Sequence, residues 1–463
     1  MESGSAIYYL LRVTRSVIPA RPAVNAFAWL TLAALLGGCS SGPNAGAPGF
    51  APNPPRFAAI PADSKISIIG PGKNAALDRL VVAFMVAQHV PNAQLAVSVR
   101  GSTTFSHGYT YRGFAASTTT PATIMRLASN TKAWLDGALY NLIEAKRVDP
   151  NAKVFAYLGI TKPLPKGAKV DKRVYDITIE DMILHESGWD DSKPPYYDPT
   201  FAMRSIALAL KLKRPVDQVE YVRYQLSKPL QEPPGKVYAY CNFCYTVLGM
   251  VIAKASGLSF ADYIARDVAG PLGLKNVLIS PTVGKRLPQE VAKYYSAYRG
   301  LSAVYVTSDR RYRFPYGGDG MVLEVAGGAS AIATSADSML AFMNNYLIWG
   351  VGTPEPGADW AREGSMPGTN TWAEQLPNGS NYAFLVNTRQ YVYGSDPTAF
   401  ESCKPSWRNS SIRALRASCS RELRRPTHSR SRYRSDRASN PNRFRNSTDS
   451  TTPRGTSRLD RCR

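Results

Sequence analysis

The sequence predicts an α/β protein of the α+β kind, in which an antiparallel sheet is flanked by helices and interrupted by an inserted all-helical lobe. Two observations support this fold class. Segments with strand character lie near both ends of the main part of the chain, and the segments between them have helical periodicity. The 463 residues are 44% hydrophobic and 10% aromatic, which is enough to bury a large core.

The N-terminal end, residues 1–39, has the pattern of an export signal. Three arginines precede the apolar run 26–36, which is too short to span a bilayer as a helix. The small residues before Cys39 resemble a bacterial lipoprotein cleavage box, and the alternative is a short buried helix with an incidental cysteine. We expect an exported, periplasmic lipoprotein, lipid-anchored to the membrane at Cys39 and followed by a Pro- and Gly-rich tether at 40–73.

The C-terminal end, residues 401–463, has a different composition from the rest of the chain. From Cys403 onward there are sixteen Arg and one Lys against four acidic residues, so +13 of the total net charge of +22 lies there. Hydrophobic periodicity is lost, and we expect disorder. This tail is either a polyanion-binding arm or an unselected extension. Because aromatic residues that would stack on bases are nearly absent, the composition does not favour nucleic acid as a partner.

The first elements of the main domain are a helix and a hairpin. Apolar residues recur at helical spacing over 74–89 and indicate an amphipathic helix. The segments 94–99 and 103–111 are rich in strand-forming residues, and the short link Arg100-Gly101-Ser102 between them predicts a β-hairpin.

Helices follow, and one strand ends the domain. Helical patterns cover 128–146, 178–185 and 244–255; the second opens with a capping box, Thr178 to Asp181, and the third ends at a Ser-Gly pair. A Ser259 to Asp262 pattern starts a further helix. A strand at 381–389 follows a Pro-Asn-Gly turn.

The chemistry that the sequence offers begins with Ser129-Asn-Thr-Lys132, its only Ser-x-x-Lys pattern. Positions three apart share one face of a helix, so the serine hydroxyl and the lysine amine can meet. A lysine withdrawn from water is easier to deprotonate and can then take the serine proton, which activates a weak nucleophile. Taken alone, the pattern is more often a solvated helix pair than a catalytic one, since Ser-x-x-Lys arises by chance in most chains of this length.

A second segment, Pro234-Gly235 through Tyr240 and Asn242, precedes the third helix. Residues two apart point the same way in an extended segment and opposite ways in a helix. Tyr240 and Asn242 can therefore reach one site only if the loop stays extended up to about Asn242, and the upstream Pro-Gly makes such a loop plausible.

The order of these motifs resembles the serine β-lactamase superfamily, in particular its class C β-lactamase, D-aminopeptidase and esterase branch. Between the two segments stands Leu184-His-Glu-Ser-Gly188, and after them come Pro271-Leu-Gly-Leu274, the pair Gly327-Gly328 and Thr334-Ser-Ala-Asp337. The resemblance covers about residues 74–399 and implies a β-lactamase/transpeptidase-like fold for a hydrolase domain at 74–400.

The resemblance also implies roles for single residues. Ser129 would be the acylated nucleophile, Lys132 its proton acceptor, and Tyr240 the group that passes the proton to the leaving group. Asn242 would hold Lys132 and the substrate. The family's third motif, on an inner strand, is expected near 360–368, where Arg362-Glu-Gly364-Ser365 stands.

The third motif differs from the family pattern in one residue. Gly364 would let the substrate backbone approach, and the Ser365 N–H would join the Ser129 N–H as an oxyanion hole. Arg362 keeps a positive charge where the family has Lys or His, but its guanidinium cannot release a proton at neutral pH. The resemblance thus implies acyl-enzyme formation and leaves efficient β-lactamase activity in question.

Other residues offer competing chemistry. The one Gly-x-Ser-x-Gly lies at 38–42, without the strand and helix of a nucleophile elbow. His185 is either a triad base or, as the resemblance implies, a structural residue at a helix end. Cys241 and Cys244 are either redox-active, half of a zinc site, or inert; no second Cys or His pair stands at finger spacing, and six cysteines are too few for a disulfide scaffold.

We therefore predict a monomeric serine hydrolase that cleaves an ester or amide carbonyl in a small-molecule or peptide-like substrate, with no cofactor and no metal. The competing hypothesis is a non-catalytic relative of the same fold that binds peptidoglycan or peptide without turnover.

Overall fold

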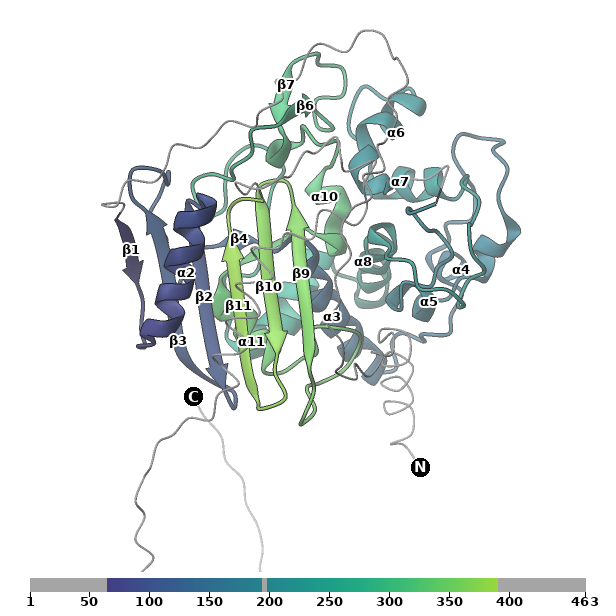
Figure 1. Ribbon diagram of the computed structural model, residues 1–463. Helices are drawn as coiled ribbons and strands as arrows, with labels where there is room; N and C mark the ends of the chain where they lie inside the picture. Colours follow the sequence, from purple (N-terminus) through teal and green to yellow (C-terminus); the bar gives the residue numbers. More distant parts are fainter. Residues whose placement is uncertain (1–64, 194–197, 390–463) are drawn as a thin grey trace, which may run out of the picture. The chain divides into compact units, whose positions relative to one another are not determined.

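The computed structural model describes residues 65–193 and 198–389 (Figure 1). The predicted export signal with Cys39, most of the predicted tether and the whole basic tail at 401–463 lie outside these residues.

A six-stranded antiparallel sheet forms the framework of the described chain, and it joins the first strands of the sequence to the last (Figure 1). The strand order is β1-β3-β2-β11-β10-β9, so β2 and β11 are neighbours. The bounds are β1 Ile66–Ile69, β2 Asn92–Val99, β3 Ser102–Tyr111, β9 Trp360–Met366, β10 Thr369–Gln375 and β11 Ser380–Val386.

The expected hairpin is present between β2 and β3. Val99 pairs with Ser102, and the two turn residues Arg100 and Gly101 both have positive φ, 50° and 81°. Two such residues match the twist of the flanking strands. The Arg100 N–H donates to the Gly379 carbonyl at 2.8 Å, which ties this hairpin to the turn between β10 and β11.

The predicted tether extends too far toward the C-terminus. Residues 66–69, expected within the 40–73 tether, form β1 and pair with β3 from Ile66 opposite Tyr111 to Ile69 opposite Gly108. A short apolar segment at a sheet edge gains backbone hydrogen bonds that its own composition does not reveal.

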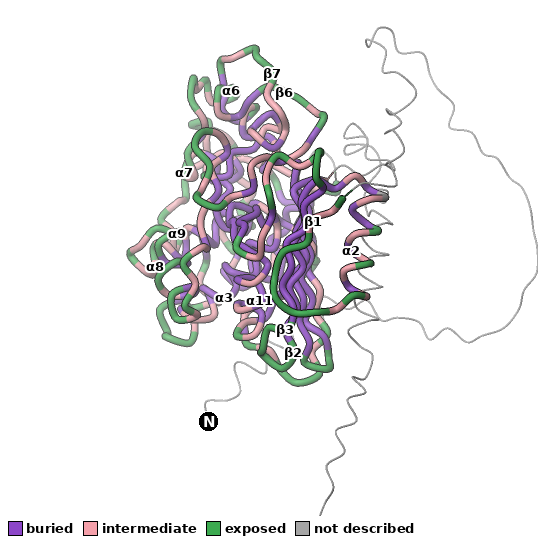
Figure 2. The backbone as a smooth tube through the Cα atoms, turned by 90° about the vertical axis from the view of Figure 1, so that its left-hand side faces the viewer, coloured by how far each residue is buried: buried purple, intermediate pink, exposed green. Residues whose placement is uncertain are grey.

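Helices cover both faces of the sheet (Figures 1 and 2). On one face, α2 (Ala75–Gln88) packs Leu77, Val81 and Met85 against buried sheet residues such as Leu95 and Phe384. On the other face, the central helices α3 and α11 and the helical lobe pack against small sheet residues, Ala96, Ala373 and Ala383. The alternation along β2 and β11 therefore places Leu95 and Phe384 toward α2 and Ala96 and Ala383 toward the lobe.

The inserted region is mostly helical, as predicted. Its helices are α3 Thr131–Glu144, α4 Val154–Leu158, α5 Ile179–Ile183, α6 Met203–Ala209, α7 Gln218–Gln225, α8 Asn242–Ser256, α9 Phe260–Tyr263, α10 Leu323–Ala326 and α11 Ala336–Met343. Short 3-10 helices are η1 Ala128–Asn130, η2 Lys172–Asp176, η3 Pro199–Ala202, η5 Gly270–Leu272, η6 Phe314–Tyr316 and η7 Gly327–Ala329. The segment η4, Ile264–Ala269, is a π-helix that follows α9.

Two small sheets complete the described chain. In the first, β4 (Met125–Arg126) and β5 (Leu278–Ile279) flank β8 (Ile332–Thr334). In the second, β6 (Arg299–Leu301) pairs with β7 (Arg311–Arg313).

One predicted helix start is confirmed, because the capping box between Thr178 and Asp181 opens α5. Asn74, expected as the first residue of its helix, is instead the N-cap of α2. Gly257, at φ 73°, ends α8. The helix α8 begins at Asn242, two residues before the sequence indicated, and β11 ends at Val386 rather than at 389.

The described helices were compared with the length and apolar composition that a membrane-spanning helix needs. No single helix there is long and apolar enough to cross a bilayer, although α8 and the segment 260–272, bent by 72° relative to each other, pass that test together by length and composition.

Candidate active site

Ser129 lies in η1, the turn that leads from β4 into α3. The residue before it, Ala128, is fully buried and has a φ of 50°, a left-handed conformation that costs a residue with a side chain roughly 1–2 kcal/mol. On one flank of this turn, the Leu127 N–H donates to Ile332 at 2.8 Å and the Leu127 carbonyl accepts the Thr371 hydroxyl at 2.7 Å. Contacts from β8 and β10 therefore hold the turn that presents Ser129.

Lys132 follows on the first turn of α3, and its side chain is fully buried. Its Nζ lies 3.1 Å from Ser129 Oγ, 2.6 Å from Asn242 Oδ1 and 2.7 Å from the Ala329 carbonyl oxygen. The predicted serine–lysine pair is therefore in direct contact.

Two of the three partners of Lys132 can only accept hydrogen bonds. A neutral amine has two N–H groups and one lone pair, so the amide oxygen of Asn242 and the carbonyl of Ala329 take its two N–H groups. The lone pair is then left for the hydroxyl proton of Ser129. Burial, and next the positive charge of Arg362, hold the pKa of Lys132 well below its ordinary value, which favours this neutral form.

Tyr240 approaches the same hydroxyl from the loop before α8. Lys132 Nζ lies 5.0 Å from the centre of the Tyr240 ring, and the Ser129 side chain lowers the pKa of the Tyr240 phenol against the larger opposite effect of burial. Burial raises the pKa of Tyr240, so the phenol keeps its proton at neutral pH. A neutral phenol in this place can relay a proton and does not act as a permanent anion.

His185 holds the Tyr240 loop from both sides. Its carbonyl accepts the Ala239 N–H at 2.8 Å, and its Nδ1 accepts the Cys241 N–H at 3.0 Å. Its ring stacks on Tyr240 with the centres 4.7 Å apart. Burial, with the charges of Arg362 and Lys132, lowers the pKa of His185 well below its usual value. This geometry favours the structural interpretation of His185 over a triad base.

Asn242 is the first residue of α8, and Cys241 before it is extended, with φ −131° and ψ 101°. The condition for Tyr240 and Asn242 to reach one site is therefore met. Of the alternatives for Cys241 and Cys244, the zinc half-site is excluded here, because a disulfide joins the two sulfurs at the start of α8. A bonded pair is neither a thiol nor a zinc ligand.

Arg362 lies on β9 behind the site and is 1% exposed. Its Nη1 is 3.3 Å from Asp136 Oδ2, and its guanidinium lies 4.1 Å above the Trp349 ring. Tyr245 donates to the same carboxylate at 3.3 Å. The structure thus shows Arg362 paired inside the protein; its expected contact with substrate stays a prediction.

Gly364 is required for the approach of β9 to η1. A Cβ at this position would lie 2.1 Å from the Leu127 carbonyl oxygen and 2.3 Å from Thr371 Oγ1. Ser365 follows on this strand and pairs with Asn370. In the described sheet β9 is an edge strand, not the inner strand expected for the third motif. The oxyanion pair of Ser129 and Ser365 N–H groups stays a prediction.

Sequence reasoning missed two partners of the site. Ala329 contacts Lys132 because η7 lies close to α3 and α8, and a Cβ on Gly328 would fall 2.1 Å from Leu135 Cδ1. The pair Gly327-Gly328 was the signal that could have located it. The second partner, Asp198, accepts a hydrogen bond from Asn242 Nδ2, and no sequence pattern marks it.

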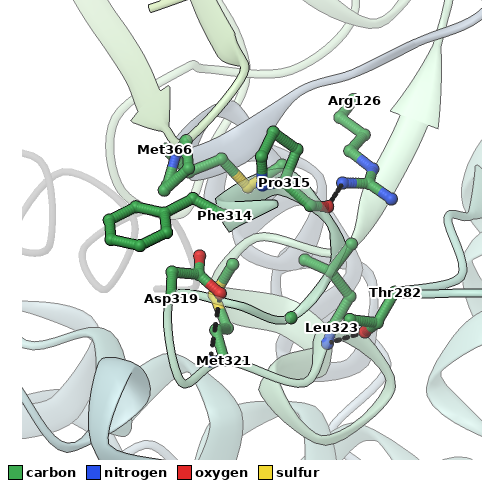
Figure 3. Close-up of a pocket in the computed structure, with 10 residues that line it drawn as sticks. Arg126, Thr282, Phe314, Pro315, Asp319, Met321, Leu323 and Met366 are labelled. Atoms are coloured by element: carbon green, nitrogen blue, oxygen red, sulfur yellow. Dashed lines mark hydrogen bonds between the residues drawn. The ribbon is translucent and has the colours of Figure 1, made fainter. Parts of the chain in front are cut away.

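A pocket lies beyond the end of β9 (Figure 3). Met366 and Phe314 border it on one side and Arg126, which donates to the Pro315 carbonyl at 2.5 Å, on the other. Asp319 points into the pocket, and its Oδ1 accepts the Met321 N–H at 3.2 Å. Across the described residues, no three His, Cys, Asp or Glu side chains gather in a way that would hold a metal ion.

The buried Asp319 carboxyl is expected to make the stability of the fold depend on pH. Burial raises the pKa of Asp319 to about 7, above its value in the unfolded chain. The stability that the protonated carboxyl contributes is therefore present at low pH and is lost as the pH rises toward 7. We expect Asp319→Asn to change the free energy of unfolding little at pH 4 and to increase it at pH 8.5, measured by urea denaturation. Asp309→Asn, at an exposed loop carboxylate, is the control. An equal effect of Asp319→Asn at both pH values would contradict the prediction.

Comparisons with known proteins bear on the family and the fold. The sequence profile of the Beta-lactamase family matches residues 77–402. A putative D-alanyl-D-alanine carboxypeptidase of Salmonella paratyphi A is 27% identical over 174 residues, which are 37% of this chain and 38% of that relative. The chain thus matches well under half the length of this curated relative.

Among solved structures, the D-amino acid amidase of Ochrobactrum anthropi SV3 in complex with L-phenylalanine amide superposes with a TM-score of 0.52 at 17% identity. The match covers 76% of this chain and 97% of the amidase chain, and at this identity it shows the fold alone. Together, the profile match over most of the chain and the shared fold show that the protein belongs to the serine β-lactamase superfamily.

Proposed function

We propose that the protein is a serine hydrolase that cleaves an ester or amide carbonyl, in a β-lactam or peptide-like substrate, through an acyl-enzyme on Ser129. The observation that carries this proposal is the placement of Lys132. Its buried amine contacts two acceptor-only oxygens and the Ser129 hydroxyl, which leaves one direction for proton transfer. Membership in the β-lactamase superfamily supports a hydrolase, and the relatives named as carboxypeptidase and amidase support amide substrates.

In the first step, Ser129 Oγ forms a bond to the carbonyl carbon while its proton passes to Lys132 Nζ. The carbonyl oxygen becomes an oxyanion, for which the N–H groups of Ser129 and Ser365 are the proposed donors. When the tetrahedral intermediate collapses, the bond to the leaving amine or alcohol breaks. The proton held on Lys132 reaches that leaving group through the neutral phenol of Tyr240.

In the second step, water attacks the acyl carbon and its proton passes to the Tyr240 and Lys132 pair. The bond between the acyl carbon and Ser129 Oγ then breaks, and the serine oxygen regains a proton. The net change is one water consumed for each ester or amide cleaved into an acid and an alcohol or amine. Each group has then returned to its starting protonation state, so the cycle can repeat.

The proposal is tested by intact-protein mass after incubation with a fluorophosphonate and, separately, with a fluorescent penicillin. We expect one adduct per chain that maps to Ser129 and is absent in Ser129→Ala. Turnover of a chromogenic ester, a D-amino acid amide and a β-lactam then identifies the substrate class. A folded wild-type protein that forms no adduct and still binds peptidoglycan would reject the hydrolase and favour a binding protein.

A further inference from the structure

Asp198, at the start of η3, lies next to the catalytic pair although no sequence motif includes it. Its Oδ1 accepts the Thr200 N–H at 2.9 Å and so caps η3, while its Oδ2 accepts a hydrogen bond from Asn242 Nδ2. Asp198, Tyr240 and Asn242 also line one small pocket together with Trp189. The carboxylate is therefore one hydrogen bond away from the group that holds Lys132.

The orientation of the Asn242 amide matters for proton transfer. An amide group presents a donor on one side and an acceptor on the other, and its two orientations have nearly the same shape. With the oxygen toward Lys132, the amide accepts an N–H of the amine. With the nitrogen toward Lys132, the amide would donate to the lysine lone pair and compete with the proton of Ser129.

A carboxylate accepts hydrogen bonds and donates none, so it pairs only with the nitrogen side of the amide. We propose that Asp198 is a positioning residue: it holds the Asn242 amide with its oxygen toward Lys132, so that the lysine lone pair remains available to Ser129. This inference rests on the proposed function of Ser129 and Lys132 and adds a residue to it.

The negative charge of Asp198 also acts on Lys132. Asp198 and Asp136 raise the pKa of Lys132, while burial and the charge of Arg362 lower it. The other ionisable groups that face Lys132 or the ring it contacts are Tyr240, Tyr245 and His185. Removal of the Asp198 charge is therefore expected to lower the pKa of Lys132 further.

The closest test is Asp198→Asn, which keeps the size of the side chain and an oxygen that can cap η3. If that oxygen still accepts the Thr200 N–H, the new NH₂ group faces the NH₂ of Asn242, and two donors oppose each other. The matched control is Asp217→Asn. Asp217 caps α7 in the same way through the Glu220 N–H and has no link to Lys132.

The first readout is the pH titration of Lys132, followed by NMR of ¹³C-labelled lysine, with the signal assigned by its loss in Lys132→Met. We expect a lower titration midpoint in Asp198→Asn than in the wild type and in Asp217→Asn. This readout does not require the protein to hydrolyse anything. Equal midpoints in all three proteins would overturn the role of Asp198.

The second readout is the rate of fluorophosphonate labelling against pH. We expect Asp198→Asn to lower the plateau of the labelling rate at high pH about 10- to 100-fold, since a displaced orienting group typically costs that much. We also expect the rise of the rate with pH to begin at lower pH, because the pKa of Lys132 is lower in this variant. A purely structural role would lower the plateau without moving this rise. If the fluorophosphonate does not label the wild type, the proposed hydrolase function is rejected. The Lys132 titration by NMR would still test the role of Asp198, because it does not depend on labelling.

A second variant, Asp198→Ser, allows the test to be made if Asp198→Asn does not fold. Asp198→Ser retains a side chain that caps helices well but is too short to pair with Asn242 as the carboxylate does. If Asp198→Asn fails to fold, Asp198→Ser is expected to show the same shift of the Lys132 titration, and a wild-type titration in folded Asp198→Ser would overturn the inference.

Discussion

Lys132→Met is expected to lower the rate of Ser129 acylation by a factor of about 10²–10⁴, the usual contribution of a positioned general base. Methionine has nearly the length of lysine but no amine, so the Ser129 proton loses its acceptor. The measurement is the time course of adduct formation with a fluorophosphonate, followed by intact-protein mass at several pH values. In the wild type, the rate is expected to rise as the pH passes the pKa of Lys132, which burial and Arg362 hold well below its ordinary value.

The control for this prediction is Lys254→Met. Lys254 lies in the last turn of α8, where its exposed Nζ donates to the Tyr157 carbonyl at 2.6 Å, far from any hydroxyl that the proposal uses. This variant should be acylated at the wild-type rate. Lys132→Met also leaves Asn242 Oδ1 and the Ala329 carbonyl without their donor, so its fold must be checked by circular dichroism. Folded Lys132→Met that is acylated as fast as the wild type would exclude the serine–lysine mechanism.

Arg362→Met is expected to destabilise the fold by about 3–5 kcal/mol near pH 8, because it leaves the buried carboxylate of Asp136 without its cation. Asp136 is 0% exposed, and burial already raises its pKa to about 6 despite the Arg362 charge. Without Arg362 this pKa rises further. Protonation then relieves the unpaired charge, so the loss of stability should be smaller at pH 5.5 than at pH 8.

The double variant Asp136→Asn/Arg362→Met separates a lost charge pair from lost packing. With neither charge present, most of the stability lost in Arg362→Met at pH 8 should return, as measured by urea unfolding of the wild type, both single variants and the double variant. A double variant no more stable than Arg362→Met would show that packing of Arg362 on Trp349, rather than its charge, stabilises this region.

Much of the fold could be predicted from local patterns. The capping box at Thr178 and the turn at Arg100-Gly101 each depend on residues within a few positions of one another, and both are present. The strand β1 was missed because its four residues form a strand only through the edge that β3 offers. Its stability comes from a partner about forty residues away in the chain, which no window of sequence contains.

In the site, too, contacts between near neighbours in the chain could be predicted, and contacts between distant segments could not. Ser129 and Lys132 are three residues apart on one helical turn, so their contact follows from helix geometry. The burial of Arg362 against Asp136 does not, because the two are 226 positions apart and meet only when β9 packs over α3. The same holds for Asp198, whose bond to Asn242 spans 44 positions.

The class of fold, the ends of several helices and the pairing of a serine with a lysine all follow from periodicity or from neighbours in the chain, so they can be read from the residues alone. How that lysine is held depends on packing: a carbonyl from η7 and an amide at the start of α8 contact it, and Asp198 contacts that amide. The pKa of a buried amine depends on which charges and dipoles surround it, and these are brought together by packing between distant segments.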